Sequence, residues 1–168
     1  MSADDERFMR AALEQAELAL ANGEMPYGAV AVSPCGEIVA RAHDQLEADD
    51  DPTSQAELLV VRRAAAARGR PLDGYKLYST VEPCAMCFST AWKARFGAAV
   101  FALSMREVKA VKPDEMDEIV IDSRALNDLG ERRLEIRSGV LADEALAQWR
   151  RVIAGRGGEP ESRPRDRT

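Results

Sequence analysis

Histidine is almost absent from this chain: His43 is the only one among 168 residues. Cysteine is scarce too, and because Cys35, Cys84 and Cys87 cannot all pair within the chain, reduced thiols are favoured over disulfides. No apolar run approaches the roughly 20 residues that a membrane-spanning helix needs. The acidic N-terminus lacks the basic start and apolar core of a signal peptide. These absences predict a cytoplasmic protein that does not associate with membranes.

Basic residues are outnumbered by acidic ones, with 23 Lys and Arg against 29 Asp and Glu, which gives a net charge of −6. Proteins that bind nucleic acid usually present a basic face, because neutralising phosphates supplies much of their affinity. We therefore expect a small-molecule substrate and no nucleic-acid partner. With 46% hydrophobic and 31% charged residues, the chain has the composition of one globular domain.

The hydrophobic pattern predicts alternating helices and strands that form a three-layer α/β/α domain around a mixed five-stranded sheet. Thr53 has the residue type of a helix N-cap, and we interpret the acidic segment before it, residues 44–52, as a solvated loop rather than a cation site. The domain is expected to span residues 1–155, and residues 156–168 to form a disordered tail. Helices are expected at 4–22, 53–68, 84–94, 123–129 and 141–154, and strands at 27–32, 37–42, 76–81, 98–103 and 134–137, with 119–121 as a candidate further strand.

Two short motifs carry the candidate chemistry. Cys84 and Cys87 are three positions apart, so their sulfur atoms face the same way on the first turn of a predicted helix. Zinc binds thiolates, and a catalytic zinc site keeps one position for water, whose pKa the metal lowers to as little as ~7. Glu57 lies on the first turn of another predicted helix, where its carboxylate suits the role of taking and returning a proton.

Each motif alone has a simpler explanation. A lone Cys-x-x-Cys is typical of half a structural zinc site or of a redox pair, but the chain has no second pair and no thioredoxin-like pattern. A single helical glutamate is most often solvated. Cys35 lies in a predicted turn, where we expect an inert residue rather than a third zinc ligand. The combination of Glu57 with the paired cysteines is much more specific than either part.

Taken together, these residues resemble the cytidine deaminase superfamily. Within it, the chain is most similar to the branch that holds bacterial guanine deaminases and tRNA adenosine deaminases, over roughly residues 4–155. The resemblance implies hydrolytic removal of an exocyclic amine from a guanine-like heterocycle, and a homodimer with the active site near the interface. It also implies that Cys84 and Cys87 bind Zn²⁺, that Glu57 is the catalytic proton shuttle, and that the Ala56 backbone and Trp92 contact the substrate. The matching segments are 26–30, 51–57, 77–87 and 92–95.

Two positions depart from the family's pattern. Gln55 replaces the histidine zinc ligand, and its neutral amide oxygen is a harder, weaker donor than imidazole. We therefore expect weakened zinc binding, or a water that stands in as a ligand. His43 is a candidate replacement, but the alternation of side chains along its strand is expected to turn it away from the site. Asp44 replaces a substrate-contacting asparagine, and because an ionised carboxylate only accepts hydrogen bonds, the preferred base is expected to carry more N–H groups than guanine.

Three hypotheses for the function remain open. The first is an active zinc deaminase in which Gln55 is a weak third ligand. The second is a catalytically impaired protein of the same fold, altered naturally or by an introduced change, that acts as a binding or partner subunit. The third is a different metal-assisted hydrolysis on the same scaffold.

Overall fold

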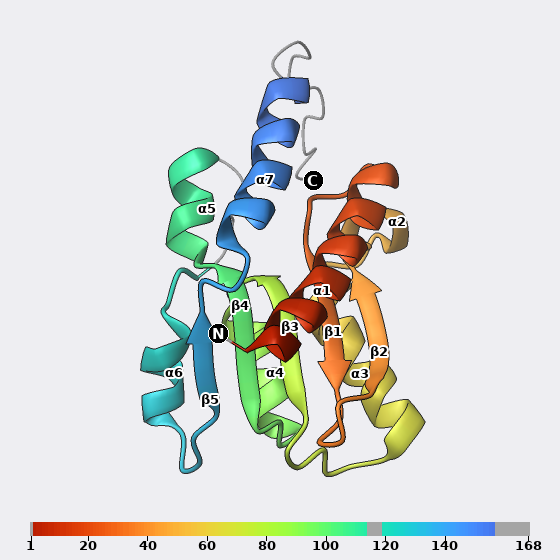
Figure 1. Ribbon diagram of the computed structural model, residues 1–168, viewed down its shortest axis with the longest axis vertical. Helices are drawn as coiled ribbons and strands as arrows, with labels where there is room; N and C mark the ends of the chain where they lie inside the picture. Colours follow the sequence, from red (N-terminus) through yellow and green to blue (C-terminus); the bar gives the residue numbers. More distant parts are fainter. Residues whose placement is uncertain (1, 114–118, 157–168) are drawn as a thin grey trace, which may run out of the picture.

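The computed structural model describes residues 2–113 and 119–156. Their centre is a five-stranded sheet with the strand order β2-β1-β3-β4-β5 (Figure 1). β1 (Gly28–Val32) runs antiparallel to β2 (Ile38–His43) and to β3 (Lys76–Val81). β3, β4 (Ala98–Leu103) and β5 (Glu135–Ser138) are parallel to one another. The mixed sheet confirms the predicted fold class.

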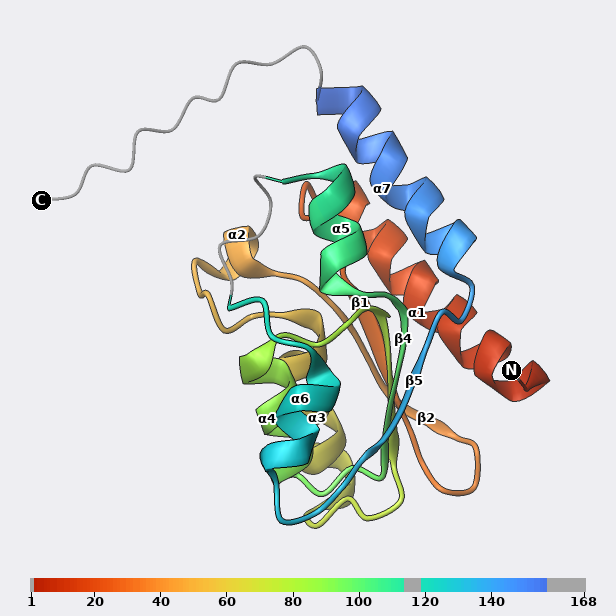
Figure 2. The ribbon, with the colours of Figure 1, turned by 90° about the vertical axis from the view of Figure 1, so that its left-hand side faces the viewer.

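Helices cover both faces of this sheet (Figure 2). One apolar core joins the sheet to the first helix and to two helices from the C-terminal half, and a second core lies against the opposite face. The first face carries α1 (Ala3–Ala21), α5 (Met105–Val111) and α7 (Ala142–Arg156), and the second carries α3 (Ala56–Arg68), α4 (Ala85–Lys93) and α6 (Ser123–Leu129). The three layers follow from this division.

Helix α1 lies unusually close to strand β1. A side-chain carbon added at Gly28 would lie 2.2 Å from the carbonyl oxygen of Ala12 and 2.4 Å from the backbone nitrogen of Ala16. Only glycine fits at such an approach, because any other residue would force the helix away from the sheet.

Strand register brings three chain segments together where β1 begins and where β2 and β3 end. Gly28 at the start of β1 pairs with His43 at the end of β2, and the neighbouring Ala29 pairs with Ser79 near the end of β3. The residues just outside these strand ends therefore lie close together. Tyr27, Asp44 and Glu82 are the residues that this arrangement brings together.

Several sequence-based boundaries were wrong. Residues 119–121 form no strand; β5 occupies the sheet edge beside β4, and Ile119 is 76% exposed. Helix α3 begins at Ala56 rather than at residue 53. The short helix α2 (Leu46–Asp49) interrupts the segment expected to be a loop.

At the C-terminal end of the described chain, helix α7 continues to Arg156, so the expected domain limit at residue 155 falls inside this helix. The rest of the tail predicted for 156–168 lies outside the described residues. Within the described residues, no helix combines the length and apolarity needed to cross a bilayer.

Candidate active site

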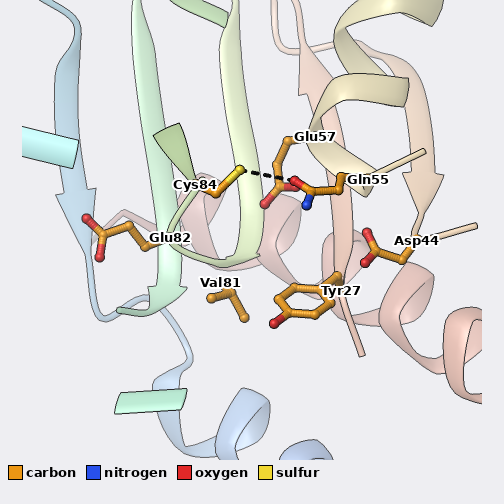
Figure 3. Close-up of a pocket in the computed structure, with 7 residues that line it drawn as sticks. All are labelled: Tyr27, Asp44, Gln55, Glu57, Val81, Glu82 and Cys84. Atoms are coloured by element: carbon orange, nitrogen blue, oxygen red, sulfur yellow. Dashed lines mark hydrogen bonds between the residues drawn. The ribbon is translucent and has the colours of Figure 1, made fainter. Parts of the chain in front are cut away.

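The N-terminal ends of helices α3 and α4 meet beside these strand ends and bring the two sequence motifs together. Gln55 is the N-cap of α3, Cys84 is the N-cap of α4, and Cys87 lies in the first turn of α4. The thiols of Cys84 and Cys87 donate hydrogen bonds to the same atom, Gln55 Oε1, over 3.1 Å and 3.0 Å. Figure 3 shows the bond from Cys84. Two sulfur atoms and one amide oxygen therefore converge on one point.

The side chain of Gln55 faces the cysteines because another residue caps its helix. Gln55 makes no side-chain capping bond. Instead Asp44, which directly follows β2, accepts a 2.7 Å hydrogen bond from the backbone N–H of Ala56 through Oδ1. The predicted N-cap, Thr53, instead donates from its backbone and its hydroxyl to Asp51. The cap comes from a distant strand, and this leaves the N-cap side chain available for the site.

Glu57 is held beside this group by a contact from the sheet. Its side chain is 4% exposed, and its Oε1 accepts a 2.6 Å hydrogen bond from the hydroxyl of Ser79 on β3. In Figure 3 the carboxylate of Glu57 lies next to the amide of Gln55 and near the sulfur of Cys84. The predicted proton shuttle and the predicted ligands thus share one small volume.

A cavity with an empty volume of about 270 Å³ opens at this point. Its walls contain carboxylates, an amide, a thiol, a phenol and one apolar side chain, and none of the described residues that line it is basic. The lining residues are Tyr27, Asp44, Gln55, Glu57, Val81, Glu82 and Cys84.

Glu82 plays a different part from the other two acids in the wall. Its Oε1 accepts from the backbone N–H of Ser123 at 2.7 Å, and its Oε2 from that of Met105 at 3.3 Å. These donors belong to the beginnings of α6 and α5. In Figure 3 the carboxylate of Glu82 points away from the group around Gln55. Glu82 therefore fastens the wall of the cavity to two helices.

The surroundings of Cys87 favour its neutral thiol. The hydrogen bond with Cys84 raises the pKa of Cys87 well above its ordinary value, and burial and the charges of Glu57 and Asp44 raise it further. A bound metal cation acts in the opposite direction, because a coordinating thiol is deprotonated outright. The excess of negative charge in this site makes it receptive to a cation.

The donor atoms fit a zinc ion with two strong ligands and one weak one. Zinc binds cysteine sulfur readily, whereas an amide oxygen is outside its usual set of cysteine, histidine and carboxylate ligands. Among the residues that the structure describes, no group of three or more His, Cys, Asp and Glu side chains is placed to hold a metal. Cys84, Cys87 and Gln55 are consequently the donors that the described chain offers.

Three further residues singled out in the sequence lie outside this cavity. Trp92, the predicted substrate contact, lines a separate groove on the outer side of α3 and α4, where its Nε1 donates to the backbone oxygen of Arg132. His43 lies 3.2 Å from the amide of Asn22, and burial lowers its pKa. Cys35 is exposed in the β1–β2 turn. The structure does not bring these three side chains to Gln55.

Two residues of the site were not assigned a role from the sequence. Ser79 is buried on β3 and contacts Glu57, and Tyr27 lines the cavity. A serine two positions after the buried Leu77, on the same face of an otherwise apolar strand, was the available signal for Ser79. The sequence of β3 alone could not show that this serine contacts Glu57 on helix α3.

A buried glutamate and two cysteines at the starts of neighbouring helices are typical of the zinc deaminases, whose signature also has a histidine where this chain has Gln55. Residues 2–103 match the family described as the cytidine and deoxycytidylate deaminase zinc-binding region. The chain belongs to this family. The family's zinc-binding character agrees with the donor set around Gln55.

The chain is also similar to individual proteins of known activity. It is 42% identical to the tRNA-specific adenosine deaminase of Bacillus subtilis over 98 residues, which cover 58% of this chain but only 60% of that relative. A solved structure from work on A-to-I editing by tRNA:A34 deaminases has 29% identity and a TM-score of 0.70, and covers 84% of this chain and 98% of that one. The guanine deaminase of Bacillus subtilis has 26% identity and a TM-score of 0.61, with coverage of 96% and 99%.

Proposed function

We propose that this chain is a zinc-dependent hydrolase that removes the exocyclic amine from a nucleobase, nucleoside or related heterocycle. One observation carries the proposal: the buried Glu57 carboxylate and the converging donors of Cys84, Cys87 and Gln55 adjoin one small cavity. Membership of the deaminase family supports the same reaction class.

Each residue has a distinct role in the proposed reaction. Cys84 and Cys87, with Gln55 as a weak third donor, would hold the zinc ion, which when bound supplies the Lewis acidity that makes hydroxide available at neutral pH. Glu57 takes one proton from the water whose oxygen bonds to the amine-bearing ring carbon and delivers it to the ring nitrogen. It then moves the second proton, from the new hydroxyl, to the exocyclic amine, so that the C–N bond breaks, ammonia leaves and a carbonyl remains. Ser79 orients the Glu57 carboxylate for this transfer.

A free, guanine-like heterocycle is the proposed substrate. The small cavity and the net charge of −6 favour a small molecule over a polyanion. A second candidate is adenosine within tRNA, which the similarity to the tRNA-specific adenosine deaminase of Bacillus subtilis favours. Binding of tRNA that falls steeply with added salt, together with conversion of its adenosine, would support the second candidate over the first.

A catalytically impaired protein is the alternative for the whole chain. The residue type at position 55 favours this reading, because an amide oxygen is outside the usual set of zinc ligands. Such a protein would keep the fold and the cavity but act as a binding or partner subunit.

Metal content and ammonia release measured on the same purified protein distinguish these possibilities. The panel contains guanine, cytosine, adenosine, cytidine and amino-substituted triazines, with Glu57→Gln as the inactive control. Ammonia release that requires both zinc and Glu57 supports the proposed function. A zinc-replete protein that is inert toward every amine, and stays inert as Gln55→His, contradicts it.

We also propose that the chain forms a homodimer, as the family resemblance implies. The apolar groove that Trp92 lines with Val61, Ala65 and Ala94 supports this proposal, because it leaves apolar area on the outer side of α3 and α4. Sedimentation of the full chain and of Trp92→Glu tests it: the wild-type protein is expected to be dimeric, and the variant to shift toward monomer. A monomeric wild-type protein contradicts the proposal.

A further inference from the structure

The part of the cavity wall that Tyr27 forms is supported from behind by the C-terminal helix. We propose that Trp149 on α7 is a positioning residue for the site: it fixes the aromatic ring of Tyr27, and with it the shape of the cavity that receives the heterocycle. The inference rests on the proposed function, since it concerns how the same cavity holds its substrate.

The backbone on both sides of Tyr27 is fixed by strand β3. The hydroxyl of Thr80 accepts a hydrogen bond from the N–H of Gly28 and donates one to the carbonyl oxygen of Pro26, each over 3.1 Å. The carbonyl oxygen of Tyr27 accepts from the N–H of Asp44 at 3.2 Å. Since the backbone is held in this way, the place of the Tyr27 ring depends on the rotation of its side chain, which packing decides.

Trp149 is the aromatic partner of that ring. The two ring centroids are 5.3 Å apart and the ring planes cross at 80°, the edge-to-face arrangement that aromatic pairs favour. Trp149 is 1% exposed and belongs to the apolar core that includes α1, α5 and α7, whereas Tyr27 lies at the border of this core and lines the cavity (Figure 3). Trp149 does not line the cavity itself, so it acts on a bound ligand through Tyr27.

The helix that carries Trp149 is anchored at the neighbouring residue. Gln148 donates from Nε2 to the carbonyl oxygen of Leu13 and to Glu17 Oε1, over 3.0 Å and 2.7 Å, and thereby joins α7 to α1. The support behind Tyr27 is therefore part of the packed core. If Trp149 were reduced to an aliphatic side chain, the Tyr27 ring could turn into the space left behind, and the cavity would widen.

Trp149→Leu removes the aromatic partner and should weaken binding of the heterocycle. KM is expected to rise by roughly three- to tenfold with kcat little changed, because the lost contact affects the bound substrate and the transition state alike. The Kd from calorimetric titration of the full chain should rise by the same factor. Trp149→Phe should restore most of the affinity: it keeps an aromatic ring, and the indole N–H that it removes has no hydrogen-bond partner in the part of the chain that the structure describes.

Phe96→Leu is the matched control for a general loss of packing. Phe96 is fully buried and its ring packs against that of Tyr75, with centroids 6.2 Å apart, in the core on the opposite face of the sheet. Neither of these two rings lines the cavity. The control loses an aromatic contact of the same kind, so it should lose thermal stability but keep the KM and Kd of the wild type.

Fluorescence provides a second measurement in which Trp149 is retained. The chain has two tryptophans, so Trp92→Phe leaves Trp149 as the only one. A heterocycle that contacts Tyr27 should change the emission of Trp149, with a midpoint at the Kd measured by calorimetry. Binding seen by calorimetry without any change in this emission would contradict the proposal, and this test remains available if Trp149→Leu does not fold.

The outcomes separate the inference from the proposed function when each amine is titrated in turn: guanine, cytosine, adenosine, cytidine and melamine. If ammonia is released but Trp149→Leu has the same KM as Phe96→Leu, the inference is wrong and the function stands. If amines bind without release of ammonia, and Trp149→Leu weakens that binding, the inference stands and the function is wrong. If no amine binds or reacts, both are contradicted.

Discussion

Cys87 Sγ lies 3.0 Å from Gln55 Oε1, although the two residues are 32 positions apart and belong to the starts of two different helices. The resemblance to the family predicts an imidazole beside this thiol, and the chain has an amide there instead. An amide oxygen is a harder and weaker zinc donor than an imidazole nitrogen. The identity of residue 55 therefore determines how firmly the site holds a metal.

Gln55→His is expected to raise zinc affinity. An imidazole nitrogen is a stronger zinc ligand than an amide oxygen, so the affinity should rise by roughly tenfold or more, the scale on which altered metal-site groups act. Competition with a chromophoric chelator measures the change. Gln15→His on α1 adds a histidine away from the cavity and should leave zinc affinity as in the wild type. Equal affinity in Gln55→His and wild type would show that residue 55 is not a ligand.

Glu57→Gln should greatly reduce turnover without changing the zinc content. The amide cannot take a proton from water, so kcat should fall by about 10²–10⁴-fold. Zinc content, measured on the same samples, should stay at the wild-type level because Glu57 is not among the proposed ligands. Glu47→Gln, on the exposed surface of α2, removes the same charge and should have no effect on either quantity. Turnover that survives in Glu57→Gln would assign the proton transfer to another residue.

Ser79→Ala should lower kcat with little change in KM. The serine hydroxyl donates a 2.6 Å bond to Glu57 Oε1, and loss of a hydrogen bond to a charged group costs enough to slow the reaction by roughly tenfold. Ser79→Thr keeps the hydroxyl and should restore most of the rate. If alanine and threonine variants lose activity equally, with a matching loss of thermal stability, Ser79 serves packing rather than the position of Glu57.

The sequence was sufficient for the fold because its signals are local. The continuous buried runs in β1 and β3 and the spacing of apolar residues in α1 specify elements whose buried faces can pack in few ways. The run at 119–121 misled because a short apolar run carries no information about whether a sheet edge is open to it. That edge was taken by β5.

The site was predictable only in part. Cys84, Cys87 and Glu57 stand in a motif whose spacing fixes them on helical turns. The cap that Asp44 supplies to α3 depends on where the end of β2 lies, which is a tertiary property. Thr53 has the better residue type for a cap, but its bonds go to Asp51 within the preceding turn. The local preference for Thr53 as the N-cap was therefore a poor guide, because the carboxylate that caps α3 comes from Asp44 at the end of β2.

The Asp5 carboxylate should make stability depend on pH at the acid end. It is 2% exposed and accepts from the Tyr78 hydroxyl at 2.8 Å and from Arg137 at 2.7 Å, which joins α1 to β3 and β5. Burial acts to raise the pKa of Asp5, but the hydrogen bonds from Tyr78, Ser2 and Arg137 together outweigh it, so the pKa lies below its ordinary value of 3.8. A carboxyl whose pKa is lower in the folded than in the unfolded state stabilises the fold above the unfolded value.

That stabilisation should be complete at neutral pH and should be lost as the pH falls below about 4 toward the lowered pKa of the folded state. Asp5→Asn removes the charge, so it should lower the free energy of unfolding at pH 7 by roughly 1–3 kcal/mol. It should also flatten the dependence of stability on pH between about 4 and 2. Urea denaturation at a series of pH values measures both effects. Asp4→Asn, on the same helical turn but 77% exposed, is the matched control and should retain the wild-type profile. An Asp5→Asn protein with the same acid sensitivity as the control would place the acid-labile contact elsewhere, because the buried bonds to Tyr78 and Arg137 would then contribute no pH-dependent stability.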